Sequence, residues 1–300
     1  MTAAPPRLLL FGAAGQVGAA VAAAAAAAGF APIALGRGDC DIADADAVAD
    51  AVAGSRALLA VNAAAYTAVD RAEREPAPLH AANVAGAGHV AASCARHGVA
   101  LIHLSTDYVF GDGMRPWRED DPVAPLSAYA ASKVDGEAVV RQRLERHLIL
   151  RLSGVFAPKG RNFVNAILAA AASRDRLTVV DDQVSCPTAA SDIAAAVMVL
   201  GQRLAAAGSL PWGTYHYRGD PPASWHDVAA IILKEAARRG RRTPPLVAID
   251  SATYGAAARR PRYSVLDCSK IAATFGITLA PWRPRLATMF EPAIPGAAPS

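Results

Sequence analysis

Short apolar runs alternate with longer stretches of helical periodicity through the first half of the chain. The apolar runs have the length of strands and cover residues 7–11, 32–35, 57–61, 100–105 and 147–152. Between them lie four stretches long enough for crossover helices, residues 16–28, 45–53, 79–97 and 128–146. Because this alternation is typical of parallel strands covered by helices on both faces, we predict a doubly wound α/β sheet of the Rossmann type.

The alternation of apolar runs and helical stretches becomes less regular after residue 152. Helices are expected at residues 163–172, 190–207 and 225–239, with strands at 177–180 and 214–217. We therefore predict a dinucleotide-binding domain and a smaller, partly interleaved substrate-binding lobe. The domain covers residues 1–152, with 189–217 returning to it, the lobe covers 153–188 and 218–290, and 291–300 form a disordered tail rich in Pro, Ala and Gly.

The composition is that of a globular protein with a mild positive charge. Of the 300 residues, 53% are hydrophobic and 19% are charged, and the net charge is +4 with a pI near 9.0. That charge suits an anionic ligand, but the chain has no long Lys/Arg block, so we expect no nucleic-acid partner. The uncharged stretch 8–36 divides into strand, glycine turn, alanine-rich helix and strand. It therefore predicts no membrane span, and we expect a cytoplasmic protein.

The four cysteines lie far apart in the sequence, at Cys40, Cys94, Cys186 and Cys268. They form no CxxC pair and have no zinc-ligand spacing. Nor do Asp70, Glu73 and Glu75 lie at metal-ligand spacing from a His or Cys, and we interpret them as an acidic first turn of a helix. We predict buried free thiols and no bound metal.

A glycine-spaced turn, GAAGQVG at residues 12–18, follows the first strand and opens the first helix. Glycines at this point permit a tight turn and a close approach of the backbone to a pyrophosphate, which faces the helix N-terminus. The alternative is that the glycines serve packing only. The motif predicts cofactor-binding positions at Gly12, Gly15, Gln16, Val17 and Gly18.

Arg37 follows the second strand, where a carboxylate favours NAD and an arginine favours the 2′-phosphate of NADP. It therefore predicts NADPH, unless it is simply a solvated loop residue, and the nearby Asp39 keeps NADH possible. Small residues after the third strand leave room for a cofactor beside the backbone. Further cofactor-binding candidates are Asp41, Ile42, Ala63, Ala64, Ala65 and Tyr66.

Tyr129 and Lys133 lie one helical turn apart in SAYAASK, residues 127–133, with Ser127 placed to cap the helix. A tyrosine holds its proton until about pH 10, but a neighbouring ammonium group favours the phenolate and brings the side chain into acid/base range. Thr106, at the end of the strand 100–105, adds a hydroxyl. The spacing YxxxK also arises by chance, so the preceding motifs are what favour a carbonyl-reducing site with Tyr129, Lys133 and Thr106 as catalytic residues.

These blocks, in this order, resemble the dTDP-4-dehydrorhamnose reductase family of the extended short-chain dehydrogenase/reductase superfamily. The resemblance spans nearly the whole chain. It rests on GAAGQVG, NAAAYTAVD at 62–70, STDYVF at 105–110, NF at 162–163, DQ at 182–183 with PT at 187–188, and RPRYSVLD at 260–267.

The resemblance implies hydride transfer to C4 of a 4-keto nucleotide sugar, in dTDP-L-rhamnose biosynthesis. Tyr129 would protonate the new alkoxide, and Lys133 would tune Tyr129 and bind the nicotinamide ribose. The resemblance further implies a monomer or homodimer. Its candidate substrate-binding residues are Thr106 at the C4 oxygen, Asp107 near the sugar, and Asn162, Gln183 and Arg260 at the nucleotide and diphosphate.

The chain departs from the family at several positions. Gly154 stands where the family usually has a tryptophan, and Ala130 stands where glycine is common. Ala19 and Ala20 replace a glutamate that holds Mg²⁺ at a dimer interface in some members, so the resemblance implies no such metal. Two alternatives stay open: a reductase or epimerase of another nucleotide sugar, and a non-catalytic regulatory homologue that retains the cofactor fold.

Overall fold

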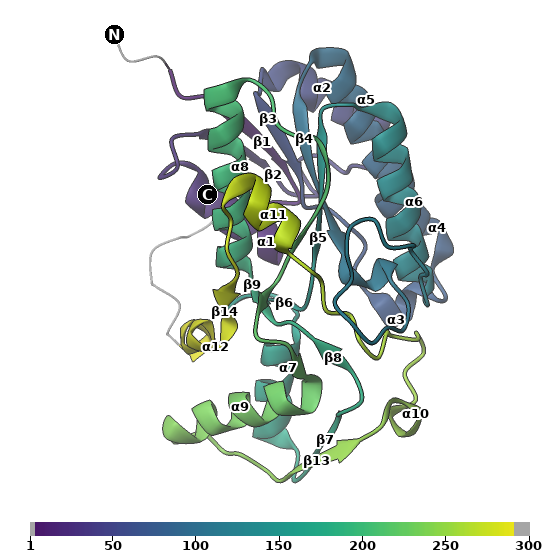
Figure 1. Cartoon of the computed structure of the whole chain (residues 1–300), viewed down its shortest axis with the longest axis vertical. Coiled ribbons are helices and arrows are strands. Elements are labelled where there is room, and N and C mark those ends of the chain that lie inside the picture. The colour runs from purple at the N-terminus through teal and green to yellow at the C-terminus, as the bar shows by residue number, and fades with distance from the viewer. Residues whose placement is uncertain (1–3, 291–300) are drawn as a thin grey trace.

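The computed structural model describes residues 4–290, so the predicted tail at 291–300 lies outside the described residues. Its centre is a sheet of six parallel strands in the order β10-β5-β4-β3-β1-β2, as Figure 1 shows. The Rossmann-type prediction is therefore confirmed. The strands are β1 (Arg7–Phe11), β2 (Ala31–Leu35), β3 (Leu59–Asn62), β4 (Ala100–Thr106), β5 (His147–Leu152) and β10 (Gly213–Tyr217).

Side chains that alternate along each strand enter two separate cores, one on each face of the sheet. Leu8 and Leu10 of β1 pack into one core, whereas Leu9 and Phe11 pack into the other. The strands are apolar on both faces because helices cover both. On the first face lie α1 (Gln16–Ala25), α8 (Ala190–Ala207) and α11 (Ser269–Phe275), and on the second α2 (Ala45–Ser55), α5 (Ala87–His97) and α6 (Ala128–Arg143) (Figure 1).

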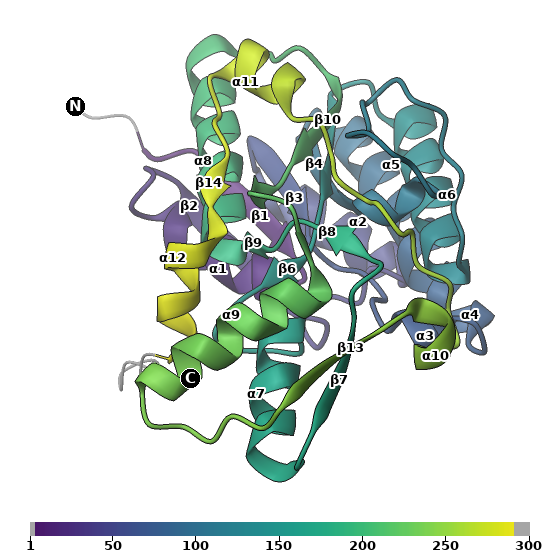
Figure 2. The ribbon, with the colours of Figure 1, turned by 60° about the horizontal axis from the view of Figure 1, so that its bottom comes forward.

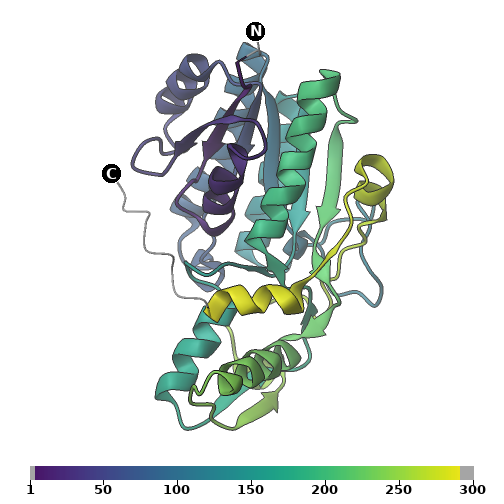
Figure 3. The same cartoon turned by 90° about the vertical axis from the view of Figure 1, so that its left-hand side faces the viewer.

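The helix α8, drawn in green, runs along the first face of the sheet beside α1 (Figure 3). Among the described residues it is the one helix with the length and apolar composition of a membrane span, and 56% of it is buried inside the protein. Its bounds match the predicted helix 190–207. The segment 269–277 differs from the prediction, because Ile271, Phe275 and Ile277 pack into the sheet core and not into the predicted lobe.

A smaller lobe lies below the sheet in Figure 1 and comes forward in Figure 2. Its helices α7 (Phe163–Ser173) and α9 (Trp225–Arg238) pack on each other and on the parallel pair β7 (Leu177–Val180) and β13 (Leu246–Ile249). Figure 2 shows α10 (Ser251–Tyr254) at the far end of β13. The lobe has a core of its own, centred on Ile167, Ile232 and Trp282.

Short elements of two to six residues complete the fold. Most of them were not predicted, because such short pieces show no measurable periodicity. The predicted helix 79–97 is in fact three joined helices, with a π-helical middle. The short helices are α3 (Val69–Ala72), α4 (Pro76–His80), η1 (Ala81–Gly86), η2 (Asp107–Val109), α12 (Trp282–Arg285) and η3 (Leu286–Phe290). The short strands are β6 (Val155–Phe156), β8 (Val184–Ser185), β9 (Thr188–Ala189), β11 (Gly219–Asp220), β12 (Ala223–Ser224) and β14 (Ala280–Pro281).

Candidate active site

The glycine turn between β1 and α1 is packed too tightly for side chains. The N–H groups of Gly12 and Ala13 donate to the Leu35 carbonyl at 2.9 and 3.0 Å. Gly12 has a φ of +79°, and a Cβ there would lie 2.5 Å from the Ala64 nitrogen. A Cβ at Gly18 would lie 2.1 Å from the Gly12 carbonyl oxygen. These two glycines therefore allow the turn, the helix and the segment after β3 to meet at one point.

A cavity of about 620 Å³ opens beside this turn. Its wall is made mostly of small residues, with two arginines, Arg37 and Arg71, that pair with two carboxylates also lining it, Asp41 and Glu75. The small residues leave room for a dinucleotide, and the arginines are available to its phosphates. The predicted cofactor residues that line it are Gly12, Gly15, Arg37, Asp41, Ile42, Ala63, Ala64, Ala65 and Tyr66. Lining residues that we did not predict are Ala14, Cys40, Ala43, Thr67, Ala68, Arg71, Glu75, Pro78, Ala81 and Ala82.

Five predicted cofactor residues do not line this cavity: Tyr129 and Lys133, described below, and three residues of the glycine motif. Gly18 is buried against the turn, and Val17 packs on the sheet core. Gln16 reaches toward the smaller lobe, where its amide donates to the Arg161 carbonyl at 3.2 Å and its Oε1 accepts from Asn162 at 2.8 Å. The structure therefore gives Gln16 contacts that join the glycine turn to the start of α7.

Arg37 is an exposed side chain at the rim of the same cavity. Its Nε donates to Asp41 Oδ2 at 2.9 Å. The hydrogen bond from the Ala43 N–H, together with Arg37, holds the pKa of Asp41 below its usual range. Asp39 accepts a hydrogen bond from the Gly36 N–H at 2.7 Å and does not line the cavity. Of Arg37 and Asp39, the arginine is therefore the one placed toward a bound dinucleotide.

Tyr129 lies in the first turn of α6, whose N-terminus is capped by Ser127 as predicted. The ring is buried, and its hydroxyl lies close to the side chain of Thr106, whose Oγ1 donates to Asp107. Burial raises the pKa of Tyr129, and the neighbouring Thr106 opposes this only in part. Tyr129 is therefore a neutral phenol at physiological pH, with a proton to donate.

The lowered pKa predicted for Tyr129 is not seen in this structure, where burial outweighs its neighbours. The Lys133 side chain is buried, and its Nζ donates to the Leu104 carbonyl of β4 at 2.8 Å. Burial lowers the pKa of Lys133 to about 8, and the negative charge of Glu137 partly opposes the shift. Tyr129 and Lys133 lie one turn apart on α6, as predicted, but the environment of each group decides its protonation.

Asp107 follows Thr106 at the end of β4 and is buried. Its carboxylate accepts hydrogen bonds from Thr106 Oγ1 at 3.2 Å and from Ser153 Oγ at 2.8 Å. Burial raises the pKa of Asp107 to about 6, although these hydroxyls favour the charged form. Carboxyl groups whose pKa is raised toward neutrality are common in functional sites. Asp107 is such a group, and it lies directly beside Thr106.

A second cavity, of about 700 Å³, lies between the end of β4 and the smaller lobe. Two predicted substrate residues, Gln183 and Arg260, line it, and Asp112, Arg259 and Arg262 add further charge. The cavity wall therefore carries three arginines, and an anionic ligand group suits it.

Arg260 is held in place by the sheet domain. Its guanidinium contacts the Asp70 carboxylate at 2.8 and 3.1 Å, and Asp70 also accepts from the Ala258 N–H. Asp70 lies in the first turn of α3, as predicted, but its partner lies 190 residues away. Arg260 is also close to Tyr108, whose ring packs at nearly a right angle to that of Tyr129, with 6.4 Å between the ring centroids. This chain of contacts links the second cavity to Tyr129.

Asn162 is not brought together with Gln183 and Arg260, contrary to expectation. Its Oδ1 caps α7 by accepting from the Asn165 N–H, and its amide donates to Gln16 and to the Ala157 carbonyl. It lines neither cavity described above. The structure thus gives Asn162 a capping role between the two parts of the chain.

Tyr129, Lys133 and Thr106 line neither cavity directly. Tyr129 belongs to an apolar cluster with Tyr66, which lines the first cavity, and Tyr108, which is close to Arg260 of the second. Sequence reasoning missed Asn83, whose amide group bonds the Tyr66 backbone and Ser132 Oγ. It lies on the π-helical segment η1, a feature often found near functional sites, but nothing in the local sequence marks it.

Two further predictions concern the cysteines and a bound metal. All four cysteines are buried and free, as predicted. Within residues 4–290 no cluster of three or more His, Cys, Asp or Glu side chains is arranged to hold a metal ion.

Gly154 adopts a backbone conformation that excludes the tryptophan common in similar sequences. Its φ is +48°, and a Cβ there would lie 2.6 Å from the Cys186 carbonyl oxygen. We expect Gly154→Ala to lower the free energy of unfolding by about 1–3 kcal/mol, from left-handed strain and backbone overlap. Urea denaturation measures this change.

Gly54→Ala is the matched control for that substitution. Gly54 lies in α2, and a Cβ there meets no atom within 4 Å. The control should be neutral or stabilising, by up to about 1 kcal/mol, because alanine is the better helix former. Equal stability of the two variants would show that the backbone at Gly154 is free to relax.

Comparison with known proteins places the chain in one family. The chain matches the family described as "RmlD substrate binding domain" over residues 6–294. It is 40% identical to dTDP-4-dehydrorhamnose reductase of Streptomyces griseus over 98% of this chain and 95% of the relative, and 38% identical to that of Aggregatibacter actinomycetemcomitans over 92% and 96%.

A solved structure supports the same family. The crystal structure of dTDP-4-dehydrorhamnose reductase from Bacillus anthracis in complex with NADP superposes with a TM-score of 0.86 at 29% identity, covering 95% of this chain and 99% of that one. The chain therefore belongs to the dTDP-4-dehydrorhamnose reductase family of NAD(P)-dependent oxidoreductases.

Proposed function

We propose that the protein reduces the C4 keto group of dTDP-4-dehydro-L-rhamnose to dTDP-L-rhamnose, with NADPH as the reductant. The observation that carries this proposal is the position of Tyr129. Its protonated hydroxyl lies close to Thr106, and its ring packs with Tyr66, which lines the glycine-lined cavity, and with Tyr108. An acid between a cofactor site and a site for an anionic substrate is what carbonyl reduction requires.

The first cavity is the proposed cofactor site. Gly12 and Gly15 supply backbone for the pyrophosphate at the N-terminus of α1, and Arg37 faces the 2′-phosphate. Asp41 and Ile42 flank the adenine, and Ala63 to Ala65 and Tyr66 line the wall. When bound, the nicotinamide supplies the hydride. The NADP-bound relative from Bacillus anthracis supports NADPH over NADH.

The proton comes from the chain itself. Tyr129 donates its hydroxyl proton to the C4 oxygen as negative charge develops there, and Thr106 donates a hydrogen bond to the same oxygen. Lys133, whose Nζ donates to the Leu104 carbonyl, is assigned to the ribose next to the nicotinamide. One hydride and one proton together convert the ketone to the alcohol, so the reaction is balanced.

The second cavity is the proposed site for the substrate's nucleotide and diphosphate. Arg260 and Gln183 line it, and Arg259 and Arg262 add positive charge. Arginine suits a diphosphate because its planar fork bonds two oxygens at once. The buried Asp107 is assigned to the sugar beside Thr106.

The test is a reaction of the purified protein with NADPH and dTDP-4-dehydro-L-rhamnose, followed by the loss of reduced-nicotinamide absorbance. We expect stoichiometric oxidation of NADPH and formation of dTDP-L-rhamnose, identified by mass spectrometry and NMR. Binding of NADPH without oxidation in the presence of this sugar would overturn the assignment of the substrate.

One observation favours a second candidate, a reductase or epimerase of another nucleotide sugar. Gly154 removes the aromatic side chain expected at this point, and its backbone lies against Cys186 and Pro187. The same assay with other 4-keto nucleotide sugars separates the two candidates. A higher kcat/KM for one of them would identify it as the substrate.

A further inference from the structure

Glu137 is a buried carboxylate that the proposed reaction does not use. Its side chain is fully buried, and both oxygens are occupied. Oε1 accepts from Ser105 Oγ at 2.6 Å and from Arg151 Nε at 2.9 Å, whereas Oε2 accepts from Arg151 Nη2 at 2.8 Å and from Arg141 Nη2 at 2.6 Å. Although burial alone would raise the pKa of Glu137, Arg151 and its other partners lower it to about 2. The group is therefore an anion at every physiological pH.

Glu137 belongs to a set of three contacts between α6 and β4. Tyr129, Lys133 and Glu137 lie on successive turns of one face of α6. They contact three consecutive residues of β4: the Thr106 hydroxyl, the Leu104 carbonyl and the Ser105 hydroxyl, respectively. Glu137 is thus the third side chain through which α6 contacts the end of β4.

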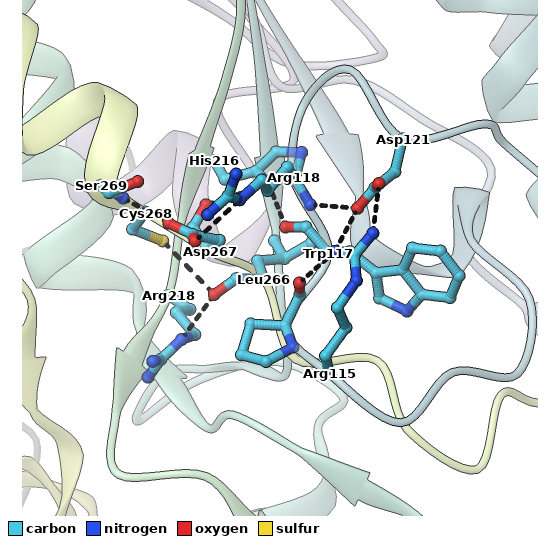
Figure 4. A network of polar contacts seen from close by, with 11 residues as sticks. Arg115, Trp117, Arg118, Asp121, His216, Arg218, Leu266, Asp267, Cys268 and Ser269 are labelled. Atoms are coloured by element: carbon cyan, nitrogen blue, oxygen red, sulfur yellow. Dashed lines mark hydrogen bonds and ion pairs between the residues drawn. The ribbon is translucent and has the colours of Figure 1, made fainter.

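The neighbouring strands complete the surroundings of Glu137. Ser105 on β4 is the register partner of Arg151 on β5, which in turn pairs with His216 on β10. Figure 4 shows His216, whose Nδ1 lies 3.1 and 3.2 Å from the Trp117 and Asp267 carbonyls. That nitrogen carries the proton, so Nε2 accepts from Arg151 Nη1 at 3.4 Å. The guanidinium of Arg151 therefore bridges a neutral histidine and the Glu137 carboxylate.

We propose that Glu137 is a positioning residue, whose carboxylate keeps Lys133 in its ammonium form and ties the Ser105–Thr106 end of β4 to the helix that carries Tyr129. This inference rests on the proposed function, because it assigns Lys133 to the cofactor's ribose. Burial works against the charge of Lys133, and Glu137 is the anion one helical turn away that opposes that effect.

Other charged or titratable groups near Lys133 do not change state between about pH 7 and pH 9. Burial keeps the pKa values of His103, His147 and His216 below the usual range of histidine, so these rings are neutral. Asp107, with a pKa of about 6, is already ionised, and Tyr129 is still protonated. Arg141 and Arg151 stay cationic. A pH dependence in this window therefore reports on Lys133.

Glu137→Gln tests the proposal because it keeps the shape and the hydrogen-bonding oxygen but removes the charge. Without that charge, burial of Lys133 is unopposed, and its pKa falls further. Lys133 then loses its proton at a lower pH, and affinity for NADPH decreases earlier as the pH rises. For a fall of one pKa unit we expect NADPH binding about tenfold weaker than wild type at pH 9, and nearly unchanged at pH 6.

The measurement is the Kd of NADPH by fluorescence titration at each pH, without a sugar substrate. In parallel, the Nζ resonance of Lys133 is followed by NMR in protein labelled with ¹⁵N-lysine. We expect both midpoints to move to lower pH in Glu137→Gln. If the proposed sugar reaction fails, this test is unaffected, and the NMR titration holds even without NADPH binding.

Two further variants separate charge from folding. Glu137→Gln combined with Arg151→Gln removes both buried charges together, so Arg151 does not remain as an unpaired buried guanidinium. The partly exposed Arg141 keeps its hydrogen bond to Thr214 Oγ1, and the midpoint should still move to lower pH. Glu235→Gln, on the exposed end of α9, is the matched control and should leave the profile unchanged. An unshifted NMR midpoint, or an affinity loss equal at every pH, would overturn the proposal.

Discussion

Replacing Tyr129 with phenylalanine should reduce turnover by about 10²- to 10⁴-fold, the usual contribution of a positioned general acid. The substitution removes the hydroxyl that lies beside Thr106, and with it the proton to be donated, but keeps the buried ring. Because the ring and the cavity wall are unchanged, the Kd of NADPH should stay within about twofold. Steady-state kinetics and fluorescence titration measure the two effects separately.

Tyr215→Phe is the matched control for this substitution. Tyr215 lies on β10, where its hydroxyl donates to the Pro211 carbonyl at 2.7 Å. It belongs to the core on the first face of the sheet, so its loss should affect stability and leave kcat unchanged. If Tyr129→Phe retained wild-type turnover, Tyr129 would not be the acid.

The second large effect is expected at Arg37, where alanine should weaken NADPH binding about tenfold or more and NADH binding by less than twofold. A charge-assisted bond to a phosphate is worth roughly 1.5–3 kcal/mol, and only NADPH carries the 2′-phosphate. Asp41, which pairs with Arg37 at 2.9 Å, competes for part of the guanidinium. Dissociation constants for both cofactors, measured at one ionic strength, give the ratio.

Arg96→Ala controls for the change in net charge. Arg96 is an exposed residue in the last turn of α5, outside both cavities. It should change neither affinity. An equal loss of NADPH and NADH in Arg37→Ala would show that Arg37 contacts a part common to both cofactors.

Local signals in the sequence were sufficient for the main elements of the fold. β1, β5, β7 and α8 begin and end where their apolar patterns predict, because a strand buried on both faces needs a continuous apolar run. The helix 128–146 was predicted slightly too long, and α6 ends at Arg143. Helix ends depend on the chain that follows, so boundaries are less clearly encoded than the elements themselves.

Part of the candidate site could also be predicted from local signals in the sequence. The glycine turn, the alanines after β3 and the Tyr129–Lys133 spacing are each set within a few residues, and the structure gathers most of the cofactor candidates around one cavity. Asn162 was assigned by resemblance alone, and the structure uses it as a helix cap. Asn83 was missed because its partners, Tyr66 and Ser132, lie 17 and 49 residues away.

The sequence by itself determined the parallel sheet, the glycine turn and the residue types available for reduction, since each depends on neighbours along the chain. Only the tertiary structure decided what these residues do to one another. Burial raises the pKa of Tyr129 and lowers that of Lys133, and Asp70 finds Arg260 across 190 residues. Desolvation and pairing depend on which groups folding brings together, so the charge of a side chain is a property of the folded site.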